Sequence, residues 1–129
     1  MEHWAELADK CDGVSIYRDF FRYVYQRPDT KLCAALAKTA TDEQCVRYGI
    51  MAQSCLDFDC REELCKIKCP VIVIGSDHDE VLGSEISRTL AEQLNCELFM
   101  YHNRDFGHAV CDEAPDFKPR MMEFFHSID

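Results

Sequence analysis

Length, composition and charge already exclude several classes of protein. Of the 129 residues, 47% are hydrophobic and 11% are aromatic, which is too apolar for a disordered chain and predicts a packed core. The 24 acidic and 14 basic residues give a net charge of -10 at pH 7, and no basic run offsets it. Neither a nucleic acid nor an anionic membrane surface is therefore an expected partner.

The N-terminal stretch MEHWAELADK favours a cytoplasmic protein. It carries acidic residues where a secretory signal has basic ones, and no apolar stretch follows them. The longest unbroken aliphatic strip, residues 71–74, is far shorter than the roughly 20 apolar residues that a membrane-spanning helix needs.

The nine cysteines also fit a reducing compartment, because their number is odd and they are spread over predicted helices and loops. One series, Cys55, Cys60, Cys65 and Cys69, invites comparison with a thiolate metal site. It lacks the paired C-x-x-C spacing of zinc ribbons and common iron–sulfur runs. We interpret these cysteines as packing residues and predict no metal and no cofactor.

Residues 1–64 are predicted to form a helical region of three or four short helices. Apolar residues recur at three- and four-residue steps through Tyr17, Phe20, Phe21 and Val24, which is the pattern of a buried helix face. Breaks are expected near Gly13 and around residues 27–30, where proline disfavours helix in the residue before it.

Residues 65–129 change to a β-α-β-α pattern. Cys69–Gly75 is a β-branched run opened by proline and closed by glycine, as in a strand of a parallel sheet. A helix over Ser84–Gln93, with Ile86, Leu90 and Leu94 on its apolar face, and a strand over Cys96–Tyr101 follow. A helix through Phe117, Met121, Phe124 and Phe125 ends the unit. The predicted fold class is thus α/β with two parallel strands.

Two loops after these strands carry the residues best suited to chemistry. In open parallel sheets, functional side chains gather in the loops beyond the carboxyl ends of the strands. The loop Gly75–Val81 contains Asp79, and the loop His102–His108 ends in a histidine 29 positions later. Adjacent parallel strands place these loops side by side, so we expect Asp79 and His108 to form an acid–histidine pair.

The sequences CPVIVIGSDHDEVLG and GHAVCDEAPDFKPRMMEFF together resemble the carboxyl-terminal portion of an α/β-fold hydrolase. The resemblance covers roughly residues 65–127. It implies that Asp79 is the acid of a Ser-His-Asp triad and that His108 is its general base. It also implies that the helical residues 1–64 are a cap, or lid, on the substrate pocket.

Asp77 is a rival for the acid, because it lies on the same short turn as Asp79. We favour Asp79 because the family usually places its acid two residues before an aliphatic residue, and Glu80 and Val81 follow it.

The sequence departs from the family in one respect. A serine hydrolase of this fold needs a G-x-S-x-G nucleophile elbow and an oxyanion hole beside it. None of the five glycines brackets a serine at that spacing; they are Gly13, Gly49, Gly75, Gly83 and Gly107. We therefore expect a fragment that supplies the acid and histidine of an ester, thioester or similar acyl hydrolase and is inactive alone.

The absence of a nucleophile elbow also predicts which partners this chain needs. We expect the sequence to have evolved as part of a longer polypeptide, whose missing amino-terminal half carries the nucleophile and with it completes the site for a small acyl-type substrate. The alternative is a non-catalytic binding or assembly module, in which the open edge of the first strand pairs with another subunit or with a second copy.

Overall fold

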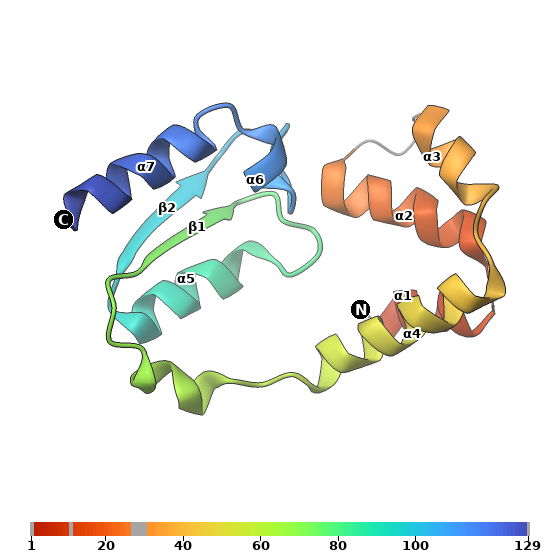
Figure 1. Ribbon diagram of the computed structural model, residues 1–129, viewed down its shortest axis with the longest axis horizontal. Helices are drawn as coiled ribbons and strands as arrows, with labels where there is room; N and C mark the ends of the chain where they lie inside the picture. Colours follow the sequence, from red (N-terminus) through yellow and green to blue (C-terminus); the bar gives the residue numbers. More distant parts are fainter. Residues whose placement is uncertain (1, 11, 27–30, 129) are drawn as a thin grey trace. The chain divides into compact units, whose positions relative to one another are not determined.

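The structure is a computed structural model that describes residues 2–10, 12–26 and 31–128. The chain is a mixed helix and sheet protein that divides into two compact units, Met1–Asp59 and Cys60–Asp129 (Figure 1). The break expected at residues 27–30 lies outside the described residues. In the described part of the chain, no helix is both long and apolar enough to cross a membrane.

The first unit is helical, as the apolar periodicity predicts. Two of its helices begin at side-chain caps: the Asp12 carboxylate accepts the Ser15 N–H at 3.0 Å, and Thr41 and Gln44 form a reciprocal capping box. The helices are α1 (Glu2–Asp9), α2 (Gly13–Tyr25), α3 (Lys31–Ala37) and α4 (Asp42–Asp57).

The core of this unit depends on small residues more than on the predicted aromatic face. Helices α1 and α4 pack closely at Gly49, which has no side chain. A Cβ atom added there would lie only 3.2 Å from the Ala8 Cβ. Ala8, Ile16 and Cys45 are buried together. On the predicted face, Val24 is buried but Phe20 is 37% exposed, so the face is only partly covered.

The second unit contains the predicted pair of parallel strands, β1 (Ile72–Ser76) and β2 (Glu97–Tyr101), in a register that pairs Ser76 with Tyr101. Each strand starts later than its sequence pattern suggests. In the described residues, β1 has β2 as its only strand neighbour. The helical elements of the unit are η1 (Arg61–Lys66), α5 (Ser84–Leu94), α6 (Val110–Glu113) and α7 (Phe117–Ser127).

The two faces of this strand pair are covered by different helices (Figure 1). A Cβ atom added at Gly75 would meet the Ser87 Cβ of α5 at 2.7 Å and the Met100 Sδ at 3.1 Å. On the other face, Tyr101 packs with Phe117 of α7. Because side chains alternate along a strand, Met100 and Tyr101 point to opposite faces.

The prediction of which residues form the buried face of α5 is wrong in part. Ile86 is 51% exposed, whereas Ala91 is buried. The close approach of α5 to Gly75 leaves room only for small residues, so Ser87 lies against the strand in place of a long aliphatic side chain.

Candidate functional site

The carboxylate of Asp79 is anchored by the backbone of its own loop. Its Oδ1 atom accepts the Val81 N–H at 2.8 Å and the Leu82 N–H at 2.9 Å. The loop also closes on the main chain of Asp79, whose carbonyl accepts the Gly83 N–H at 3.1 Å. These bonds hold one carboxylate oxygen in place and leave the other free to bind a partner.

That partner is His108. Its Nδ1 atom lies 3.0 Å from the Asp79 Oδ2, and the two residues come from the loops that follow β1 and β2. The Asp79 side chain is 15% exposed and the His108 side chain 35%. An ionised carboxylate only accepts hydrogen bonds, so neutral His108 carries its proton on Nδ1 and its lone pair on Nε2.

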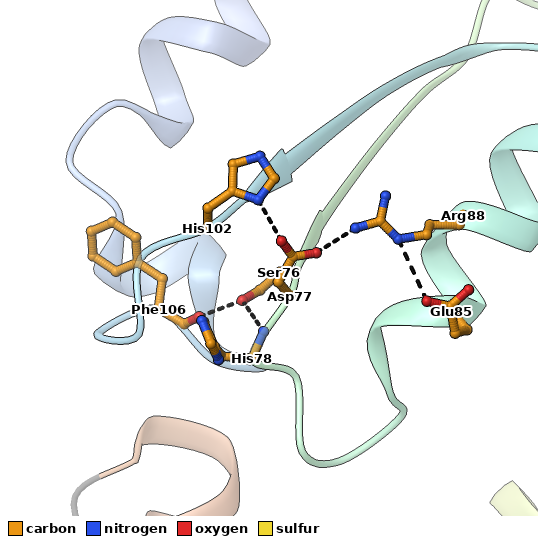
Figure 2. Close-up of polar contacts among 7 residues, drawn as sticks. All are labelled: Ser76, Asp77, His78, Glu85, Arg88, His102 and Phe106. Carbon is orange, nitrogen blue, oxygen red and sulfur yellow. Dashed lines mark hydrogen bonds and ion pairs between the residues drawn. The ribbon is translucent and has the colours of Figure 1, made fainter.

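Ser76, the last residue of β1, joins the two loops and was not singled out from the sequence. Its side chain is buried, and its hydroxyl donates to the Phe106 carbonyl and accepts the His78 N–H at 3.0 Å (Figure 2). Ser76 thereby fixes the loop that carries His108 against the loop that carries Asp79. A small polar residue closing an aliphatic strand is the signal that identifies it.

Asp77 faces a different set of partners. Its two carboxylate oxygens contact Arg88 of α5 and the Nδ1 atom of His102, and Arg88 also reaches Glu85 at 3.6 Å (Figure 2). The hydrogen bond with His102, followed by the charges of His102 and Arg88, lowers the pKa of Asp77 despite some desolvation. With both oxygens engaged elsewhere, Asp77 makes no hydrogen bond to His108.

The pKa of Asp79 reflects two opposing effects. Burial raises it, but the hydrogen bonds from the Leu82 N–H, from His108 and from the Val81 N–H outweigh burial. The pKa therefore lies below the ordinary value of 3.8, and Asp79 is ionised at neutral pH.

This shift predicts how the contribution of Asp79 to the free energy of unfolding depends on pH. Because the folded pKa is lower than the unfolded one, ionised Asp79 stabilises the folded protein above about pH 3.8 and loses this effect as the pH falls through the folded pKa. The measurement is the free energy of unfolding of the wild type minus that of Asp79→Asn, from pH 7 to pH 2. We expect the difference to favour the wild type at pH 7 and to shrink below pH 3.8; a constant difference would contradict this.

The second nitrogen of His108, Nε2, makes no hydrogen bond with residues 2–10, 12–26 and 31–128. The geometry thus offers a base with an oriented lone pair, but the described residues bring no serine or cysteine to it. Across the same residues, no cluster of three His, Cys, Asp or Glu side chains is placed to hold a metal ion.

Comparisons of this chain with protein-family models, with curated proteins and with solved structures find no match. The observations that bear on function are therefore the geometry of Asp79 and His108 and the sequence pattern around them.

Proposed function

We propose that Asp79 and His108 are the acid and the base of a serine-hydrolase triad, in the carboxyl-terminal part of an α/β-fold hydrolase. The observation that carries this proposal is the 3.0 Å contact between the Asp79 Oδ2 and the His108 Nδ1. The anchored Oδ1 atom and the Nε2 atom, which makes no hydrogen bond within the described residues, support it, because a triad needs a fixed carboxylate and a free basic nitrogen.

Each group has a defined part in the proposed reaction. A hydroxyl placed at the His108 Nε2 gives up its proton as its oxygen attacks the acyl carbon of an ester or thioester. Asp79 stabilises the imidazolium that results, and the imidazolium passes the proton to the leaving group. Water then attacks the acyl-enzyme through the same nitrogen, which releases the acid and restores the hydroxyl.

The nucleophile in this proposal comes from outside the described residues, on another part of a longer polypeptide or on a second chain. The helices of residues 1–64 act as the cap of the complete enzyme, and the substrate is a small acyl compound. Cys55, Cys65 and Cys69 are exposed free thiols, which corrects our interpretation of them as packing residues and suits our placement of the protein in the cytoplasm.

The chain alone is expected not to react with a fluorophosphonate probe, which forms a covalent bond with activated serines. The same probe should label a serine in the species that this chain forms in its own cells. The experiment tags the gene at its native locus as wild type, His108→Ala and Asp77→Asn, and then measures labelling of the tagged species by gel fluorescence and mass spectrometry.

The three strains distinguish the possible outcomes. Labelling in the wild type and Asp77→Asn strains that is lost in His108→Ala supports the triad. Two results would refute the proposal that this chain supplies the acid and base and another segment supplies the serine. One is a reactive serine within the isolated 129-residue chain, and the other is labelling that is unchanged in His108→Ala.

A second candidate function rests on the edge of β1. Within the described residues, the only strand that pairs with β1 is β2, so the backbone groups on the other side of β1 are available to pair with a strand of another subunit. This assembly module would appear in the same strains as a tagged oligomer with no probe-reactive serine.

A further inference from the structure

The helical unit contains an apolar cavity of about 160 Å³ between α1, α2 and α4. Two of its lining residues, Ile16 and Ala52, are only 5% and 4% exposed. Four of the others are aromatic: Trp4, Tyr17, Phe20 and Tyr48. Among the described residues that line it, none carries a charge at neutral pH.

Its aromatic wall is held in a fixed arrangement. The rings of Tyr17 and Tyr48 meet edge to face at 5.9 Å, and the Tyr48 hydroxyl donates to the Tyr17 hydroxyl at 3.3 Å. This hydrogen bond, with burial, raises the pKa of Tyr48 to about 12, so its phenol stays neutral at physiological pH. Trp4 packs against Phe20 at 6.3 Å on another part of the wall.

The size and lining of the cavity point to one class of occupant. The cavity opens to solvent along Cys55 and Met51, which is 62% exposed. An apolar cavity of roughly 150 Å³ admits a benzene ring, and a water molecule in this one finds few of the two to four polar partners that it needs. Edge and face contacts with the four aromatic side chains of the lining would add to the burial of such a ring. A charged ligand would lose its hydration without gaining a partner.

We propose that this cavity is a binding site for a single small, uncharged aromatic ring, as a free ligand or as the terminal group of a larger one. The site lies wholly within the unit Met1–Asp59, so the proposal does not depend on Asp79, on His108 or on any hydrolytic activity.

The probe for this site is fluorobenzene, added to the full chain. Binding is followed by ¹⁹F NMR and by the emission of Trp4, which is the single tryptophan of the chain and lies in the cavity wall. We expect saturable binding with a Kd of roughly 0.1–1 mM, which is within the efficiency limits for so small a ligand. 4-Fluorobenzoate, which has the same ring and a carboxylate, should bind at least about tenfold more weakly.

Two variants fill the cavity and one controls for them. Ala52→Leu adds bulk at a buried lining position, and Cys55→Phe adds it at an exposed lining position where folding is easily preserved; each should raise the Kd at least about tenfold. Cys55→Ser keeps the volume and should bind like the wild type. Circular dichroism shows which variants fold, and Cys55→Phe decides the question if Ala52→Leu does not.

The proposal is overturned if fluorobenzene gives only linear, non-saturable changes, or if a folded Cys55→Phe variant binds it as tightly as Cys55→Ser. His108→Ala should bind fluorobenzene normally. The two proposals therefore fail independently. Absence of fluorophosphonate labelling counts against the hydrolase alone, and absence of fluorobenzene binding counts against the aromatic-ring site alone.

Discussion

If the proposed hydrolase is correct, replacing His108 by alanine lowers kcat of that complete enzyme by about 10⁴-fold or more. The imidazole is the only group that the described residues place on Asp79 with a nitrogen left free, so its loss removes the base that we propose takes the proton of the nucleophile. Alanine has no atom that could replace this nitrogen. The effect should fall on kcat more than on KM, because the lost contact is made to the reacting atoms and strengthens in the transition state.

The measurement is steady-state hydrolysis of an acyl ester by the complete enzyme purified from the tagged strains, compared with His102→Ala. His102 is a suitable control because it is an exposed histidine that pairs with Asp77, in the same loop as His108. We expect its replacement to change kcat by less than about tenfold. Equal losses in the two variants would contradict the assignment of the base.

Asp79→Asn should also lower kcat by about 10⁴-fold, for a reason specific to this loop. Two backbone N–H groups, from Val81 and Leu82, point at one side-chain oxygen and would hold the amide oxygen of asparagine in that position. The amide NH₂ would then face the His108 Nδ1, which must become an acceptor. The histidine proton moves to Nε2, and the nitrogen that should act as a base becomes a donor.

This tautomer change is measurable without turnover. In ¹⁵N NMR of the full chain at neutral pH, His108 should carry its proton on Nδ1 in the wild type and on Nε2 in Asp79→Asn. Asp77→Asn is the matched control, because Asp77 pairs with Arg88 and His102 and should leave the His108 tautomer unchanged and kcat within about tenfold. If Asp77→Asn were the more damaging variant, the acid would be reassigned.

The sequence predicts the elements and loops around Asp79 and His108 better than it predicts how the helices pack. The two strands, the order of loops and the 29-residue separation of Asp79 and His108 follow from local patterns and from the rule that parallel strands end at one edge. Ser76 was missed, because a small polar residue at the end of an aliphatic strand marks a position of interest but does not show that its hydroxyl links two loops distant in sequence. The choice between Asp77 and Asp79 likewise needed the positions of Arg88 and His102.

Packing against neighbours explains where the sequence patterns failed. Ile86 is placed on the buried face of α5 by its spacing alone, yet the close approach of Ser87 to Gly75 leaves Ile86 exposed. In the helical unit, the approach of Ala8 to Gly49 sets the core, and the larger aromatic residues are left to line a cavity. Such close approaches depend on two elements at once, so the periodicity of residues within one element does not predict them.

The sequence by itself determined the helical first half, the β-α-β-α second half and the two loops that carry the candidate residues, because each depends on residue types along one segment or on a general rule of sheet topology. Only the tertiary structure decided which carboxylate contacts His108, how Ser76 joins the loops and where a cavity remains among the helices. These features depend on distances of a few ångströms between segments far apart in the chain, which no local pattern encodes.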